Sequence, residues 1–207
     1  MVQNFKFLFV VLIFAFCILH SNCYAQTNVL LLDDFEGVIS GGPQGTVDFG
    51  SGNGSSVEVT QAVDIKNSGN QALKIVYDAL PGGYIYVARG TGLDAQNTNW
   101  QLKPSDIKWE EYSAISFYVY GTDSKAKIAF DIKDSGTEIW RFVVEDDFKG
   151  WKKVVCAFDK FILRDDWQPL DADKNGQLDF PIKSFQFEPL PGSKGTLYFD
   201  TVELVKK

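Results

Sequence analysis

The stretch that decides the fold is KIAFDIK at positions 127–133, where Ile128, Phe130 and Ile132 alternate with smaller or polar residues. A period of two places these three side chains on one face of a strand. The same alternation recurs within 73–77, 115–119 and 184–188. Turn residues separate the runs, and no window sustains a long helical period, although 104–112 has room for a short helical turn. We therefore expect an all-β fold, a two-sheet antiparallel β-sandwich, most simply a jelly roll.

The chain has 207 residues, 45% of them hydrophobic, which is enough to bury the core of one domain. We expect a single sandwich over residues 26–207. The glycine- and serine-rich segment 41–56 indicates a long exposed loop. Near the C-terminus the inward positions change from odd-numbered Leu197 and Phe199 to even-numbered Val202 and Leu204. That change of phase predicts a β-bulge around Asp200.

The first 25 residues have the pattern of a secretory signal. Lys6 precedes an uninterrupted apolar run at 7–19, and the segment ends in Cys23-Tyr24-Ala25. The run is too short to cross a bilayer, which takes about 20 residues. We expect cleavage after Ala25 and a secreted, periplasmic or cell-surface protein with no membrane segment. An uncleaved anchor is the alternative.

Cleavage and charge exclude several classes of function. The mature chain has no histidine and one cysteine, Cys156, which lies in a strand-like run and is expected to be buried. A Ser-His-Asp or Cys-His nucleophile system and a zinc site of the histidine type are therefore excluded. The formal charge is −7 and there is no basic run, so nucleic acid is excluded as a partner.

Two segments combine aromatic and hydrogen-bonding side chains in the way that sugar ligands require. Arg164, Asp166 and Trp167 lie within the run RDDWQP at 164–169, and Tyr84 and Tyr86 alternate with apolar residues. The C–H face of a sugar stacks on an aromatic ring, and its hydroxyl groups bond to planar polar groups. A surface ion pair beside a core tryptophan is the alternative interpretation of 164–169.

Two acidic segments are candidates for binding calcium. Residues 171–179 place oxygen-bearing side chains as an EF-hand loop does, but Ile182 stands where the bidentate glutamate belongs, so a polar turn is the better interpretation. Separately, if the first and last strands pair, Asp34 or Glu36 approaches Asp200. Two carboxylates that approach each other repel, and a hard cation such as Ca²⁺ would relieve the repulsion.

Several segments together resemble family 11 of the carbohydrate-binding modules, which has a galactose-binding-like jelly roll. The resemblance rests on Leu32-Asp33-Asp34-Phe35-Glu36-Gly37, Gly150-Trp151-Lys152-Lys153-Val154, Arg164-Asp165-Asp166-Trp167-Gln168-Pro169 and Tyr198-Phe199-Asp200. It implies a concave cleft that binds one β-glucan chain, a structural calcium ion and no catalysis by the module itself. Members of the family are commonly joined to cellulases.

The resemblance also assigns individual cleft residues. The family's cleft aromatics correspond to Tyr84 and Trp167, its arginine and one aspartate to Arg164 and Asp166, and another aspartate to a position near Asp134. Lys183 and Pro189 replace a cleft aspartate and a cleft tyrosine of the family. The lysine raises the hypothesis that an acidic sugar such as a uronate is bound.

The leading interpretation is a secreted, monomeric, non-catalytic protein that binds a polysaccharide of the β-glucan class. A glycoside hydrolase is the first alternative, because Glu138, Glu145 and Glu188 lie on strand-like segments, although no two of them form a paired motif. A protein-interaction or assembly module on the same fold is the second.

Overall fold

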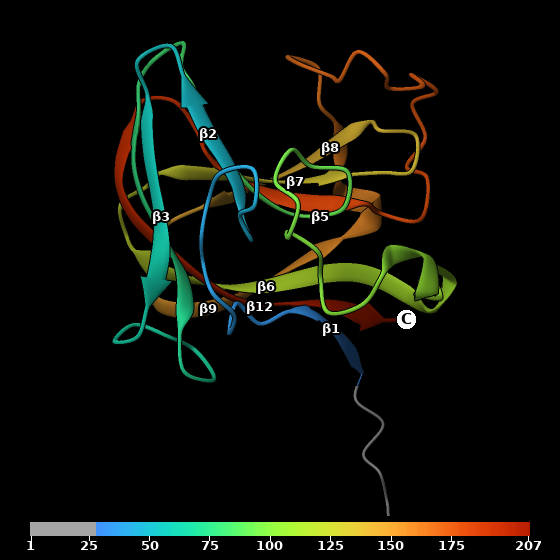
Figure 1. Cartoon of the computed structure of the whole chain (residues 1–207), viewed down its shortest axis with the longest axis horizontal. Coiled ribbons are helices and arrows are strands. Elements are labelled where there is room, and N and C mark those ends of the chain that lie inside the picture. Colours follow the sequence, from blue (N-terminus) through green and yellow to red (C-terminus); the bar gives the residue numbers. More distant parts are fainter. Residues whose placement is uncertain (1–27) are drawn as a thin grey trace, which may run out of the picture.

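The computed structural model describes residues 28–207, so the expected signal segment at 1–25 lies outside the described residues. Two six-stranded sheets pack face to face, and every strand pair is antiparallel (Figure 1). The predicted all-β, two-sheet antiparallel sandwich is therefore confirmed. Within 28–207, no helix is long and apolar enough to cross a membrane.

The first sheet has the strand order β3-β4-β12-β6-β9, and β1 also pairs with β12. The expected pairing of the first and last strands is thus present. The strands of this sheet are β1 (Val29–Asp33), β3 (Ser56–Ala62), β4 (Ala72–Ala79), β6 (Tyr112–Thr122), β9 (Lys149–Ala157) and β12 (Ser193–Lys206).

The second sheet has the strand order β10-β8-β7-β11-β5-β2. Its strands are β2 (Asp48–Gly52), β5 (Tyr84–Gly90), β7 (Lys127–Lys133), β8 (Ile139–Glu145), β10 (Ile162–Leu163) and β11 (Ser184–Pro189). Three short 3₁₀ helices connect strands: η1 (Pro104–Asp106), η2 (Trp109–Glu111) and η3 (Phe158–Lys160). The first two fall where the sequence predicted a helical turn.

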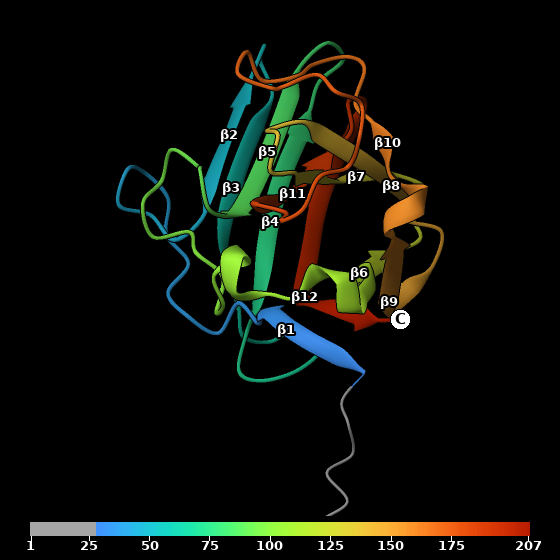
Figure 2. The same cartoon turned by 90° about the vertical axis from the view of Figure 1, so that its right-hand side faces the viewer.

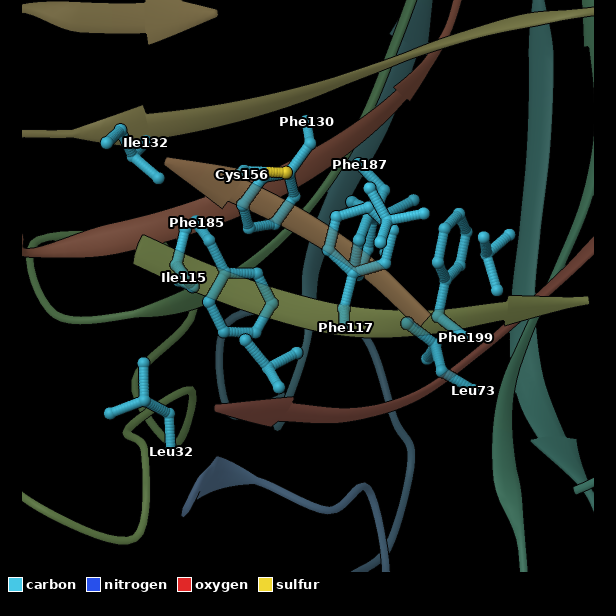
Figure 3. Packing of buried hydrophobic residues seen from close by; sticks show 14 of the residues in the cluster. Leu32, Leu73, Ile115, Phe117, Phe130, Ile132, Cys156, Phe185, Phe187 and Phe199 are labelled. Atoms are coloured by element: carbon cyan, nitrogen blue, oxygen red, sulfur yellow. The ribbon is translucent and has the colours of Figure 1, made fainter. Parts of the chain in front are cut away.

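Phenylalanine rings from both sheets fill the space between them (Figure 3). Phe187 of β11 stacks on Phe199 of β12 with ring centroids 3.7 Å apart, and Phe117 of β6 contacts Phe130 of β7 at 4.6 Å. Such ring pairs stabilise the fold by more than the burial of their apolar surface alone would. Cys156 is fully buried beside this cluster, as expected, and burial raises the pKa of its thiol.

The bulge expected near Asp200 is present, because the register between β12 and β6 shifts between Asp200 and Glu203 and Thr201 has a φ of +47°. The expectation of one long loop over 41–56 is wrong, since β2 lies within that segment and pairs with β5. A strand containing Gly50 and Gly52 shows no apolar alternation, so only its partner strand reveals it.

Candidate functional site

A cleft of about 610 Å³ lies on the face of the second sheet that points away from the core. The strands β2, β5, β7 and β11 form its floor, and segments 82–83, 92–94 and 164–167 form its rim. The segment between β10 and β11, which includes 164–167, projects beyond the strand ends at the top of Figure 2. Because successive side chains of a strand point to opposite faces of the sheet, β5, β7 and β11 each have one face in the core and the other in the cleft.

Tyr84 and Tyr86 of β5 line the cleft next to the edge strand β2. Tyr84 is 48% exposed, and Tyr86 is half-buried. Burial raises the pKa of Tyr86, and Asp48, Asp94 and Tyr84 raise it further, so its hydroxyl group remains protonated at neutral pH.

Trp167 lines the same cleft from the segment after β10, which is the opposite edge of this sheet. Its side chain is 56% exposed, and the Arg164 guanidinium carbon lies 5.6 Å from the ring centroid in a cation–π contact. Gln168 fixes this segment: its amide donates to the carbonyl oxygens of Ile139 and Arg164 at 2.9 and 2.7 Å and accepts from the Ile139 amide at 2.8 Å. The exposed indole therefore stands on an anchored loop.

Five charged side chains join into one network across the cleft floor: Asp131, Arg141, Arg164, Asp166 and Glu188, hereafter the ion network. Arg164 pairs with both oxygens of Asp166 at 2.7 and 3.0 Å and with Glu188 at 2.9 Å. Arg141 pairs with both oxygens of Asp131 at 2.8 Å and with Glu188 at 2.8 Å. Arg164, Asp166 and Glu188 also line the cleft.

The residues of the ion network shift one another's pKa values. The Arg164 hydrogen bonds hold the pKa of Asp166 below its usual value, so this cleft carboxylate is ionised at neutral pH. Burial raises the pKa of Glu188, against the attraction of Arg141 and Arg164. Burial alone would lower the pKa of Arg141, but Asp131 and Glu188 outweigh it and raise that pKa. The cleft floor is therefore pre-ordered by charge-assisted hydrogen bonds.

The family model for the carbohydrate-binding domain of family 11 matches residues 24–207. The chain belongs to this family.

Two curated relatives are much longer than this chain and match it over a small part of their length. The chain is 27% identical over 183 residues to an endoglucanase H of Acetivibrio thermocellus, and the match covers 84% of the chain and 18% of that protein. It is 30% identical over 128 residues to a mannan endo-1,4-β-mannosidase of Bifidobacterium adolescentis, covering 61% of the chain and 11% of that protein. The chain thus spans less than a fifth of the length of these curated relatives.

A solved structure confirms the fold. The family 11 module from Clostridium thermocellum, in complex with a β-1,3-1,4-mixed-linked tetrasaccharide, superposes with a TM-score of 0.65 at 23% identity. The match covers 86% of this chain and 95% of that one. The two chains share the sandwich architecture.

Five of the six side chains expected to contact ligand come together in the cleft: Tyr84, Tyr86, Arg164, Asp166 and Trp167. Asp134 does not line it, because its side chain is fully buried. Its carboxylate accepts hydrogen bonds from the Glu138 amide at 2.8 Å and the Trp140 indole N–H at 3.0 Å. Asp134 therefore fixes the turn between β7 and β8.

The three carboxylates expected to bind calcium do not form a metal site, because no group of three or more acidic, cysteine or histidine side chains within 28–207 has metal-site geometry. Asp34 accepts from the Glu36 amide and from Gln101. Glu36 accepts from Asn70 and Gln71, and Asp200 from Asn67, Ser68 and Thr201. In this arrangement the three carboxylates bond to N–H and O–H donors rather than surrounding a common cation position. Calcium binding stays a prediction.

The two departures from the family pattern lie near the cleft without entering its lining. The Lys183 ammonium donates to the Thr137 hydroxyl at 3.0 Å, and Pro189 is buried at the end of β11 opposite Ile128. Another cation, Lys133, does line the cleft. Burial lowers its pKa and Lys183 lowers it further, whereas Asp171, Asp48 and Asp94 act in the other direction.

Sequence reasoning missed three members of the ion network as parts of the site: Asp131, Arg141 and Glu188. The sequence offers Glu188 only as a candidate carboxylate of the hydrolase alternative, whereas the structure makes it a 5% exposed partner of two arginines. A local signal for Asp131 existed, because it is the acidic residue on the outer face of the KIAFDIK strand. Nothing local marks Arg141, whose pairing with Asp131 depends on the register of β7 against β8.

Proposed function

We propose that this protein binds a neutral β-glucan chain in the cleft without hydrolysing it, as an exported protein. The observation that carries the proposal is the arrangement of Tyr84 and Trp167, which enter one cleft from opposite sides: Tyr84 from β5 beside the edge strand β2, and Trp167 from the segment after the other edge strand, β10. Between them lie ionised and hydrogen-bonding side chains that are already paired. Rings on both sides with polar groups between them match a chain of sugar rings edged by hydroxyl groups.

Each part of the cleft has a role in this proposal. The exposed rings of Tyr84 and Trp167 stack on sugar faces with little loss of conformational freedom, because aromatic side chains have only two rotatable bonds. Asp166 accepts hydrogen bonds from sugar hydroxyl groups, and Arg164 holds it in place through two hydrogen bonds. A floor ordered before binding lowers the entropy cost of association.

Charge favours a neutral glycan over a uronate. Four carboxylates line the cleft, those of Asp48, Asp94, Asp166 and Glu188, against two cationic side chains, those of Lys133 and Arg164. The excess of carboxylates would repel a carboxylate-bearing sugar. The mixed-linked glucan bound by the Clostridium thermocellum module is neutral, which is consistent with this class of ligand.

Hydrolysis is the second candidate, because a raised pKa at Glu188 beside a lowered pKa at Asp166 is a pairing that glycosidases use for acid and nucleophile. The contacts oppose it. Glu188 accepts hydrogen bonds from Arg141 and Arg164, and a proton on its carboxyl group would break both ion pairs. We therefore favour binding without catalysis over the hydrolase and over an interaction module, whose partner would not need this polar cleft.

Isothermal titration calorimetry with soluble mixed-linkage β-glucan tests the proposal, with polygalacturonate as the acidic comparison. We expect binding to the glucan alone, weakened about fivefold by Trp167→Ala, because one aromatic contact contributes about 1 kcal/mol. Leu170→Ala is the matched control, since Leu170 is fully exposed in the same segment and does not line the cleft. Release of reducing sugar would favour the hydrolase, and absence of any glycan binding would favour the interaction module.

A further inference from the structure

The edge strand β2 places a glycine opposite each cleft tyrosine. In the antiparallel pairing of β2 with β5, Gly50 lies opposite Tyr86 and Gly52 opposite Tyr84. Directly opposed residues of an antiparallel pair point to the same face of the sheet. Both glycines therefore lie on the cleft face, beside the two rings.

Backbone conformation does not explain these glycines. Ten glycines of the described chain have a positive φ, which favours glycine, and neither Gly50 nor Gly52 is among them. Glycine inside a strand is less stable than a residue with a side chain, because it loses more conformational freedom on folding. Another constraint must therefore account for glycine at both positions.

The tyrosine rings supply that constraint. A Cβ atom on Gly52 would lie 2.4 Å from Cε1, 2.5 Å from Cζ and 2.7 Å from the hydroxyl oxygen of Tyr84. A Cβ atom on Gly50 would lie 3.0 Å from Cε1 and the hydroxyl oxygen of Tyr86. The Tyr84 ring thus occupies the space of a side chain at 52, and the Tyr86 ring only touches that space at 50.

We propose that Gly52, and more weakly Gly50, are positioning residues of the cleft: the missing side chains let Tyr84 and Tyr86 lie across β2 and present their rings to the ligand. The inference rests on the proposed function for its effect on binding. An aromatic side chain that covers an opposed glycine also shields the edge-strand backbone, which fixes the ring orientation.

Contacts at the adjacent turns keep β2 from moving aside. The Asn53 side-chain amide donates to the Gly82 carbonyl at 3.0 Å, and the Leu80 amide donates to the Ser55 hydroxyl at 3.0 Å. These bonds join the turn after β2 to the turn before β5. Because the two turns are fixed to each other, a side chain at 52 displaces the Tyr84 ring rather than the strand.

Three glycine-to-alanine variants of the full chain test the inference. We expect Gly52→Ala to weaken binding of the mixed-linked tetrasaccharide about three- to tenfold, as loss of one aromatic contact would. Gly50→Ala should have a smaller effect. Gly37→Ala is the matched control, because a Cβ atom there meets nothing within 4 Å, and it should leave the affinity unchanged.

A double-mutant cycle separates positioning from a general structural effect. In a Tyr84→Ala background, Gly52→Ala should cause no further loss of affinity, because the displaced ring is already absent. The thermal midpoint should not fall in either glycine variant. An undiminished loss of affinity in the Tyr84→Ala background, or a marked drop in the midpoint, would overturn the assignment.

NMR spectroscopy with ring-¹³C-labelled tyrosine decides the question without any ligand. The Tyr84 ring signals, assigned by their absence in Tyr84→Ala, should shift in Gly52→Ala and remain in place in Gly37→Ala. Unchanged Tyr84 signals in Gly52→Ala would refute the positioning role. If the wild-type protein binds no glucan but these signals shift, the proposed function fails and the positioning of Tyr84 stands.

Discussion

Replacement of Glu188 by glutamine tests the ion network most directly. The Glu188 carboxylate accepts hydrogen bonds from Arg141 at 2.8 Å and from Arg164 at 2.9 Å, and its residue is 5% exposed. Glutamine keeps the size of the side chain and replaces two charge-assisted bonds by neutral ones. Each such replacement costs about 1 kcal/mol, so we expect Glu188→Gln to lower the free energy of unfolding by about 2 kcal/mol.

For a domain of this size, that loss corresponds to a fall in Tm of about 4–8 °C. Glu188→Ala should cost more, about 3–5 kcal/mol, because two buried guanidinium groups then lose a partner outright. Glucan affinity should fall in both variants, because Arg164 is then less firmly held beside the cleft. The Asp166 carboxylate that Arg164 orients moves with it.

Urea unfolding followed by fluorescence measures these differences at a constant m-value. Glu145→Gln is the matched control, because Glu145 is exposed on β8 and its loss should change the free energy of unfolding by less than about 0.5 kcal/mol. A Glu188→Gln variant as stable as the wild type, or more stable, would refute the reasoning. It would mean that the desolvation of the carboxylate, which raises the pKa of Glu188, outweighs the attraction of both arginines.

Three further predictions concern other parts of the chain. Asp146 accepts hydrogen bonds from Thr122, Asp123 and Ser124, so Asp146→Ala should lower the free energy of unfolding by about 2–3 kcal/mol and leave glucan affinity unchanged. Burial alone would raise the pKa of Asp146, but these hydrogen bonds lower it below its usual value. The stabilisation that Asp146 provides should therefore be constant at neutral pH and disappear as the pH falls through the lowered pKa. Acid unfolding of the wild type and of Asp146→Ala will measure this. Because the carboxylates of Glu36 and Asp200 are occupied by N–H donors, EDTA should leave the Tm unchanged, and a Tm that rises with added Ca²⁺ would show that these groups reorient around the ion. Mass spectrometry of protein expressed with its own N-terminus should find an exported chain beginning at Gln26, whereas an intact terminus in the membrane fraction would favour the anchor.

The amino-acid sequence alone determined the architecture of this protein. Period-two alternation such as that of Ile128, Phe130 and Ile132 is a local property, and it defines strands and their buried face without reference to any partner. The phase change before Val202 likewise marked the bulge in the last strand. The segments that resemble family 11 extend over much of the chain, and the family match confirms them.

Only the tertiary structure decided which polar residues meet. Arg141, Asp131 and Glu188 come from three different strands, and the network among them exists because of the β8-β7-β11 register. Asp134, which resembles a cleft residue in sequence, is instead buried in a turn. β2 is a strand because β5 pairs with it, and Gly52 matters because the Tyr84 ring lies over it. Alternation records one strand's own environment, whereas pairing partners and ring positions are set by residues far away in the chain, so no local pattern encodes them.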